Sequence, residues 1–425
     1  MRADCAGDRG EQCGECFVTE VHVREQRNAC SYDTDTTERE RTTMPVRHVV
    51  CCAVLLACAT AAAQPPAAPL RAAQELRASG RLDEAIASLR AVLARDPGNG
   101  QARLELALAL EQAGDLVAAR YHLELALGAD LEPAQKDRAL LELRRIREAS
   151  TTASFAINTL PPVRSRTIVD AAGNASTVTG DGSYGLGVVA NGRLALGDDL
   201  RSFVRAALDW REYGGRLDDF VFGQASAGRV FRVERTTYTA EVGTLASVYQ
   251  QRHWFTGGLM QGAATVYVDH ELTWTTTGLA RRIEFTDLKG ATANQAYLFS
   301  DLRWVRPGSI AWGVGATLGA SRARDDWRGF DYGELRASWL REFRGGVIAE
   351  ARTGAGLAKY RAIEPGFTRA RRDVSGSIGL DFTLREWSVF GLAPRFSVAY
   401  TRVESNADTY DGRRATAGVG LTSSY

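Results

Sequence analysis

Cysteine is missing from most of this sequence. All seven cysteines lie between positions 5 and 58, and none occurs from residue 59 to residue 425. Free thiols are a liability for a chain that crosses an oxidising compartment, so this distribution favours an exported protein. Cys13 and Cys16 have the spacing of a metal-binding pair, but no second pair is present to complete four ligands. We therefore expect no metal site.

Long apolar runs and a net charge are also missing. No run reaches the roughly 20 residues that a membrane-spanning helix needs, and charged residues make up 24% of the chain, too many for a helical membrane protein. The 52 basic and 51 acidic residues leave a net charge of +1, so the chain offers nucleic acid no electrostatic attraction. These absences exclude a helical membrane protein and argue against a nucleic-acid partner.

Histidine is rare, which limits the candidates for catalysis. After residue 63 the sequence contains His122, His253 and His270. A hydrolase would need a serine and a histidine held together by an orienting carboxylate or amide. His270 is the candidate for an outer-membrane lipid hydrolase, but nothing in the sequence places a serine beside it. We expect a structural histidine, and we predict no catalytic, cofactor-binding or metal-binding residue and no enzyme activity.

The N-terminal segment resembles an export signal that begins internally. Residues 1–43 are polar and aperiodic, whereas Met44 starts a short basic segment, an apolar stretch and an Ala-x-Ala site that ends at Ala63. We predict that residues 1–43 are a disordered gene-start artefact, that residues 44–63 are the signal peptide, and that cleavage leaves Gln64 first. Residues 64–69 would form a linker. Lipidation at Cys58, which ends a lipobox-like segment, is the alternative.

A repeat of 34 residues follows the linker. Gly, Ala and Leu recur at this spacing, with Gly80, Ala85, Leu89 and Val92 matched by Gly114, Ala119, Leu123 and Ala126. This period is the tetratricopeptide signature, in which small residues let two helices cross closely. We predict a helical domain over residues 70–149, made of two repeats and a capping helix from Glu132 to Glu148. An ordinary helical hairpin bundle is the alternative.

The first helix of each repeat carries polar residues on the side that should be concave. This side is a candidate groove for a protein client, although a plain solvated helix face would have the same pattern. The residues are Arg71, Gln74, Arg77, Gln101, Glu105 and Gln112.

From residue 151 the helical period gives way to alternation of two. Between Val374 and Leu384 the even positions are mostly apolar and the odd positions mostly polar, and residues 203–211 and 265–274 show the same pattern. Alternation over many segments, behind an export signal, is typical of a transmembrane antiparallel β-barrel. We predict an α + β multidomain protein, with a barrel of about 14 strands over residues 151–425.

The polar face of these strands predicts a water-facing lumen. We expect its charged residues to form a satisfied network, some of which could also meet a passing substrate. The predicted lining residues are Arg205, Asp209, Arg211, Asp269, Glu271, Asp301, Arg303, Asp381 and Arg385.

Two segments resemble the surface lipoprotein assembly modifier (Slam) family. The first is the repeat segment 102–123 with Glu132-Pro133, and the second runs from Arg371 to Arg414, with Arg-Asp, Gly-x-x-Pro and Ser-Asn elements in the family's order. The resemblance implies a monomeric outer-membrane translocon that moves a lipoprotein or secreted client, after assembly by the barrel-insertion machinery. Its N-terminal domain would lie in the periplasm, and its partners would be the outer-membrane bilayer and the client.

An exopolysaccharide exporter is the alternative from another class. Such exporters also join tetratricopeptide helices to a barrel, usually with a longer solenoid and a lumen lined by charges of one sign. The predicted lining here contains both signs.

Overall fold

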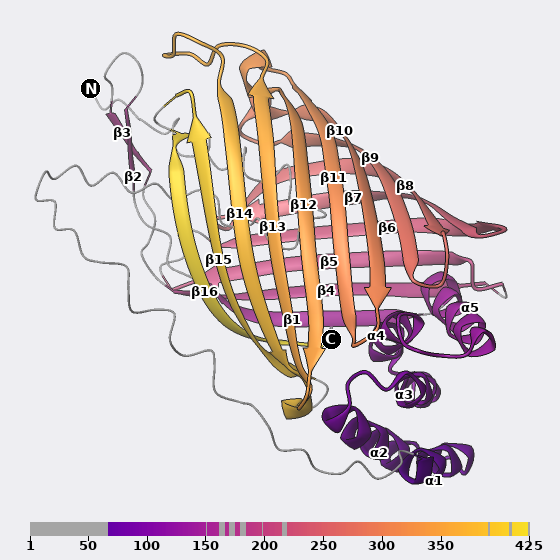
Figure 1. Cartoon of the computed structure of the whole chain (residues 1–425). Coiled ribbons are helices and arrows are strands. Elements are labelled where there is room, and N and C mark those ends of the chain that lie inside the picture. Colours follow the sequence, from indigo (N-terminus) through magenta and orange to yellow (C-terminus); the bar gives the residue numbers. More distant parts are fainter. Residues whose placement is uncertain are drawn as a thin grey trace, which may run out of the picture.

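A computed structural model describes residues 67–149, 151–160, 166–169, 175–178, 184–197, 199–214, 219–389, 392–407 and 410–423. The gene-start artefact, the signal peptide with its Ala63–Gln64 cleavage site, and lipidation at Cys58 lie outside the described residues and stay predictions. The described chain forms a helical domain followed by a β-barrel (Figure 1).

Five helices form the N-terminal domain, and none of them is long and apolar enough to cross a membrane. They are α1 (Ala67–Ala78), α2 (Leu82–Arg95), α3 (Gly100–Gln112), α4 (Leu116–Leu127) and α5 (Pro133–Ala149). The first pair and the second pair are the two predicted repeats, and α5 is the predicted capping helix. Helix α1 begins inside the predicted linker, because Pro69 is tolerated in the first turn of a helix.

The repeated glycines are explained by the turns between paired helices. Gly80 and Gly114 have backbone φ angles of 79° and 86°, which residues other than glycine rarely adopt. Asn99 and Asp115 then cap α3 and α4, since each side chain accepts a hydrogen bond from a backbone N–H three residues later. Behind these turns a leucine-rich core includes Leu89, which is fully buried.

Fourteen antiparallel strands close into a barrel, as predicted. From β4 to β16 each strand pairs with its neighbour in sequence, and β1 closes the barrel between β16 and β4. The barrel strands are β1 (Thr152–Leu160), β4 (Gly185–Leu196), β5 (Ser202–Tyr213), β6 (Phe220–Val233), β7 (Thr236–Tyr249), β8 (Arg252–Tyr267), β9 (Leu272–Phe285), β10 (Ala293–Arg306), β11 (Ile310–Ala323), β12 (Phe330–Phe343), β13 (Val347–Tyr360), β14 (Arg372–Leu384), β15 (Ala393–Ser405) and β16 (Gly412–Thr422). Strands β2 (Arg166–Val169) and β3 (Ala175–Val178) form a separate hairpin.

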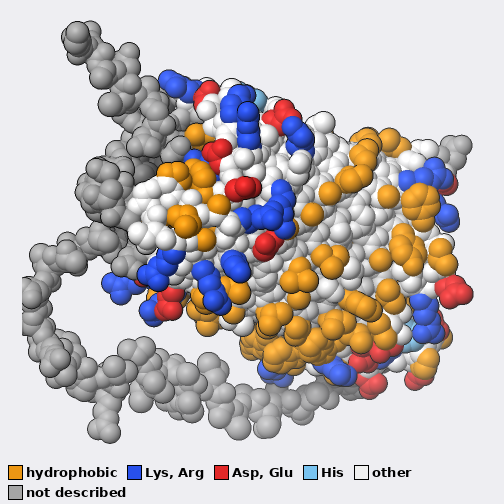
Figure 2. Space-filling view, turned by 90° about the horizontal axis from the view of Figure 1, so that it is seen from above, with side chains coloured by type: hydrophobic (Ala, Val, Ile, Leu, Met, Phe, Trp, Pro, Cys, Tyr) orange, Lys and Arg blue, Asp and Glu red, His pale blue; other side chains and the backbone are white. Residues whose placement is uncertain are grey.

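The outer wall is apolar, as the alternation predicts. Leu208, Leu318 and Ile378 point outward and are 42%, 63% and 56% exposed, although they are hydrophobic. In Figure 2 hydrophobic side chains form a broad band across the wall, and charged side chains gather toward its ends. Such a band suits contact with lipid chains.

One predicted strand is instead a hairpin. Residues 265–274 do not run straight, because β8 ends at Tyr267 and β9 begins at Leu272. The Asp269 carboxylate accepts hydrogen bonds from the backbone N–H groups of Glu271 and Leu272, both at 2.7 Å. This local bonding favours a turn over a strand, and the alternation did not reveal it.

The two ends of the barrel differ. The helical domain lies against the end that holds the short turns at residues 234–235, 268–271, 307–309 and 344–346 (Figure 1). The opposite end has one short turn, at residues 250–251, and longer connections such as residues 286–292 and 361–371. In outer-membrane barrels the short turns face the periplasm. The end with the helices is therefore the periplasmic end, and the opposite end is extracellular.

Near the extracellular end, apolar side chains fill part of the lumen. We call these residues the aromatic cluster; they come from the inward positions of β6–β10, β12 and β13. Trp254, for example, packs within 5.3–6.3 Å, ring centre to ring centre, of Phe220, Tyr249, Phe255 and Phe285. The sequence analysis expected a polar lumen throughout and missed this cluster, which comprises Phe220, Leu245, Trp254, Phe255, Leu259, Leu279, Ile283, Phe285, Tyr297, Phe299, Phe330 and Tyr360.

Candidate functional site

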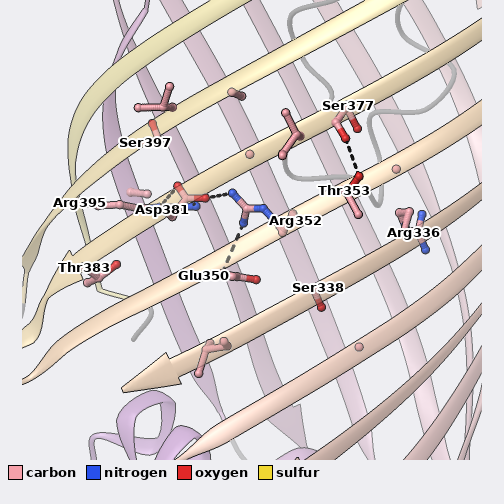
Figure 3. Close-up of a pocket in the computed structure, with 18 of the residues that line it drawn as sticks. Arg336, Ser338, Glu350, Arg352, Thr353, Ser377, Asp381, Thr383, Arg395 and Ser397 are labelled. Carbon is pink, nitrogen blue, oxygen red and sulfur yellow. Dashed lines mark hydrogen bonds and ion pairs between the residues drawn. The ribbon is translucent and has the colours of Figure 1, made fainter. Parts of the chain in front are cut away.

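The remaining part of the lumen is a polar cavity of about 770 Å³. Its wall is formed by β1, β4, β5 and β10–β16, and one face of α4 lies at its periplasmic end. Small side chains such as Ser377, Ser397 and Thr416 line the wall near β14–β16, which is why space remains there (Figure 3). The cavity is the candidate functional site.

Asp381 is the centre of an ion-pair group on this wall. Arg395 donates to its Oδ1 from Nε at 2.9 Å, and Arg352 pairs with its Oδ2 (Figure 3). Arg352 also lies 3.4 Å from Glu350. Alternate positions of β13 and β14 place these side chains on the inward face, so the group follows directly from the strand alternation.

Other predicted lining residues are also paired inside the lumen. Asp301 contacts Arg336 at 3.1 Å, and Arg205 contacts Glu241 at 2.8 Å. Asp209 contacts Arg211 at 2.9 Å. These predicted residues thus form ion pairs of mixed sign. The sequence analysis did not name the other charged residues of this wall, although the same alternation marks them: Glu241, Glu334, Arg336, Glu350, Arg352 and Arg395.

Helix α4 lies across the periplasmic side of the cavity. Val117, Arg120, Tyr121 and Glu124 lie on the helix face that lines it. Glu124 Oε2 lies 3.3 Å from Arg303 of β10, and its Oε1 lies 2.7 Å from Arg147 of α5. Burial alone would raise the pKa of Glu124, but the nearby arginines lower it to about 2. Arg303 thus lies in the cavity wall with a helix residue as its partner.

A buried charged group joins the helices to the barrel. We call it the junction cluster: Arg103 of α3, His122 of α4, Glu342 of β12 and Arg385 after β14. Arg103 and Arg385 lie 2.7 and 2.6 Å from the two oxygens of Glu342, and all four side chains are at most 2% exposed. Arg103 also donates to Pro97 C=O and to the Ser309 hydroxyl, at 2.7 and 2.8 Å.

His122 lies between the two arginines of the junction cluster. Its ring nitrogens are 3.3 Å from Arg103 and 3.4 Å from Arg385. Burial, together with these two positive charges, holds the pKa of His122 well below its usual range. The ring is therefore neutral at neutral pH and can accept from one arginine.

Arg385 was predicted to line the lumen, and this prediction is wrong. The residue begins the short 3-10 helix η3 (Arg385–Trp387) after β14, so the strand alternation no longer applies to it. Its side chain enters the junction cluster instead.

An apolar contact supports the same docking. Leu125 of α4 belongs to one small hydrophobic cluster with Val305 and Ala311 of the barrel. Gly128 follows α4 where a Cβ atom would come within 2.7 Å of the backbone of Val305 and Arg306. Glycine is therefore needed for the end of α4 to approach β10 this closely.

Asp269 and Glu271 were predicted to line the lumen, and the structure corrects this as well. Both lie in the β8–β9 turn at the periplasmic end. Glu271 contacts Lys136 of α5 at 3.1 Å, and His270 contacts Asp137 of the same helix at 2.8 Å. The turn holds α5 against the barrel, which gives His270 a structural role.

Three of the six predicted groove residues meet. Glu105 of α3 accepts from Gln74 at 2.9 Å and from Arg77 at 3.1 Å, both on α1. Arg71, Gln101 and Gln112 are exposed on the same two helices. The first helices of the two repeats are thus adjacent, and a client groove on them stays a proposal.

The barrel closes through a short seam. Strands β1 and β16 share three register pairs, whereas β1 shares nine with β4 and β15 shares eleven with β16. Ser423 extends the seam, since its N–H donates to Phe155 C=O at 3.0 Å. Within the described residues, no strand pairs with this edge of β16 from Gly412 to Gly418. The cavity reaches this seam at Asn158, Thr159 and Gly418.

Comparison with protein families agrees with this architecture. The model described as surface lipoprotein assembly modifier matches residues 229–423, and a tetratricopeptide repeat model matches residues 70–132. The chain is a tetratricopeptide-plus-barrel protein of the surface lipoprotein assembly modifier type. Its barrel lies in the outer membrane, and its helical domain faces the periplasm. This assigns the Slam-type protein to surface lipoprotein assembly in general terms, and the family and barrel are consistent with a role without catalysis.

No curated protein matches the sequence. Solved barrels resemble the structure at low identity. OmpT, an outer membrane protein of Vibrio cholerae, is 10% identical, with 64% of this chain and 95% of that chain covered and a TM-score of 0.34. A bacterial polysaccharide outer membrane secretin is 12% identical, with 64% and 98% covered and a TM-score of 0.32. The TodX monoaromatic hydrocarbon channel is 9% identical, with 67% and 92% covered and a TM-score of 0.37.

Proposed function

We propose that this Slam-type protein passes a lipoprotein or secreted protein client across the outer membrane, with no chemistry of its own. The client would gather at the helical domain and enter the polar cavity after α4 moves. The observation that carries the proposal is the position of α4, which is part of the helical domain and also lines the periplasmic side of the cavity. Capture at the helices and opening of the lumen would then be one event.

The lining of the cavity supports a peptide client. Its charges have both signs and are already paired, so neither a cation nor an anion is held at one strong site. Small side chains near β14–β16 leave room for an extended segment, while the aromatic cluster fills the other part of the lumen. The route would therefore follow the β14–β16 wall, next to the seam.

The experiment is transport into or out of liposomes. The protein, expressed from Gln64 behind a substitute export signal, is reconstituted with the product of the adjacent gene, and exposure of that product to external protease is measured. We expect the full chain to move the client and a variant without residues 70–148 to insert but move much less.

A cysteine lock tests the role of α4 directly. The chain from residue 59 onward has no cysteine, so Leu125→Cys with Ala311→Cys introduces one defined pair within a single cluster. We expect a short thiol crosslinker between the two cysteines to stop transport. Where the link is a disulfide or a reducible crosslinker, a reductant should restore transport. The matched control is Leu125→Cys alone with the same reagent.

Two results would overturn the proposal. One is transport that continues at the same rate with α4 crosslinked. The other is a protein that moves no client yet passes polysaccharide in the same vesicles, which would favour the exporter.

A further inference from the structure

Basic side chains gather on one side of the barrel's outer surface, at the extracellular end. They occupy outward positions of β9, β11 and β13–β16, and all are exposed. They are Arg282, Arg322, Lys359, Arg372, Arg402 and Arg413. The matching outward positions on β4–β7 are Leu186, Glu212, Val221 and Val248. The chain as a whole is almost neutral, so the concentration on one side stands out.

Half of these cations have acidic partners. Arg282, Arg322 and Arg402 each lie 2.7 Å from a carboxylate, on Glu284, Asp331 and Glu404 respectively. Lys359, Arg372 and Arg413 have no acidic partner within the part of the chain that the structure describes. Positive charge therefore exceeds negative charge on the β13–β16 side.

Like charges also face one another across the strands. Lys359 of β13 is directly opposite Arg372 of β14, and Arg402 of β15 is directly opposite Arg413 of β16. Like charges in such pairs are destabilising unless an anion lies between them. We call Lys359, Arg372, Arg402 and Arg413 the basic rim.

The basic rim lies at the edge of the apolar band. One outward position closer to the middle of the wall, Lys359 is followed by Leu357, Arg372 by Val374 and Arg413 by Ala415. A group that touched both sets of residues would need a charged head and apolar chains. This height on an outer-membrane barrel is the headgroup level of the outer leaflet.

We propose that the basic rim binds the phosphate groups of an anionic glycolipid in the outer leaflet, with its acyl chains against β13–β16. Guanidinium groups present paired N–H donors that match phosphate oxygens, and an ammonium adds a compact positive charge. The cations are exposed and do not enclose a pocket, so a free phosphate ion would gain little there, whereas the adjacent apolar wall would hold a lipid.

The test uses the full barrel protein in detergent micelles and native mass spectrometry. The probes are bis-phosphorylated lipid A, the same lipid without phosphates, and inorganic phosphate. We expect the bis-phosphorylated lipid to bind. A triple variant, Lys359→Gln with Arg372→Gln and Arg413→Gln, should bind it about a hundredfold more weakly, since each basic residue near a charged lipid surface contributes roughly fivefold. The control is Arg341→Gln, which removes an exposed outward arginine from the periplasmic end of β12.

Folding of the variants is checked by the heat-dependent shift of the barrel on a gel. Equal binding of the phosphorylated lipid by the folded triple variant would overturn the proposal. So would equal binding of the lipid without phosphates, or full competition by inorganic phosphate at the concentration of the lipid. If the triple variant does not fold, Lys359→Gln alone is tested, and it should bind the bis-phosphorylated lipid roughly fivefold more weakly. Unchanged binding by this folded single variant would overturn the proposal as well.

Discussion

Arg103 of α3 and Glu342 of β12 form a fully buried ion pair with a distance of 2.7 Å between Nη1 and Oε2. One residue belongs to the helical domain and the other to the barrel. A buried charge is stable only with its partner in place, so the pair fixes one docked position of the helices. Arg385 completes the group from the second oxygen of Glu342.

Replacing Glu342 should undock the helices. Glu342→Gln leaves two buried arginines without their carboxylate, a change that costs about 3–5 kcal/mol in comparable sites. We expect trypsin to cut between α2 and α4 much faster, with the barrel still heat-modifiable on a gel. Arg282→Gln, which breaks an exposed pair, is the control and should leave the cutting rate unchanged.

An apolar replacement of the whole group distinguishes pairing from packing. Arg103→Met, Glu342→Leu and Arg385→Met together should restore trypsin resistance relative to Glu342→Gln, because no buried charge is left unpaired. Resistance that stays at the Glu342→Gln level would show that the charges are needed for docking in themselves.

Docking should weaken at acid pH. The pKa of His122 is lowered in the folded protein, so the unfolded or undocked chain takes up a proton first as pH falls below about 6.5. Stability from this group is therefore complete above that pH and is lost as pH falls toward the folded pKa. We expect the thermal midpoint of the helical domain to fall between pH 7.5 and pH 5.5.

The variant His122→Gln should remove most of this pH dependence, and His253→Gln, at an exposed ring, should leave it intact. Glu124 affects stability at a lower pH. Because its pKa is lowered to about 2 in the folded protein, its contribution to stability is complete above about pH 4.5 and is lost as pH falls further. If the thermal midpoint of the helical domain still falls between pH 7.5 and pH 5.5 in His122→Gln, the pH dependence comes from other groups.

Close approach of α4 to β10 should depend on Gly128. A Cβ atom at this position meets backbone atoms that cannot move aside, so Gly128→Ala should shift α4 and reduce crosslinking between cysteines at Leu125 and Ala311 by severalfold. Gly278→Ala is the matched control, because nothing lies within 4 Å of its Cβ position. Unchanged crosslinking in Gly128→Ala would mean that α4 has other room to settle.

The two faces of β14 should respond differently to arginine. Leu380→Arg places a charge on the lipid side and should cost about 2–4 kcal/mol if the site lies near the bilayer midplane. Ser377→Arg places it in the cavity and should cost less than about 1 kcal/mol. Urea unfolding of the barrel in lipid measures both. Equal costs would contradict the assignment of the faces.

The periodicity of the sequence predicted the helical repeats and the barrel strands, because each depends on a pattern that repeats within a short segment. The glycines at 80 and 114, and the alternation from Val374 to Leu384, are consequences of backbone geometry that each segment carries by itself. The helical repeats and the strand count were therefore predictable. The same alternation also indicates the inward positions of six charged residues on the strands: Arg205, Asp209, Arg211, Asp301, Arg303 and Asp381.

What joins distant segments was not predictable. Glu342 follows the alternation of β12 like any inward residue, and only the docked helices make it the partner of Arg103 and Arg385. Asp269 was misplaced because its carboxylate accepts hydrogen bonds from the N–H groups two and three residues later, which turns the chain. The aromatic cluster was missed because inward apolar residues look the same as outward ones in a sequence.

The aromatic cluster also divides the barrel by stiffness. Packed aromatic and aliphatic side chains on β6–β10, β12 and β13 make that part of the wall resist bending, since they would have to separate. Apart from the Asp381 group, the inward side chains of β14–β16 that line the cavity are small, and β1 meets β16 at the shortest seam. Any change in the girth of the barrel should therefore be taken up by these four strands, while the rest of the wall moves as one piece.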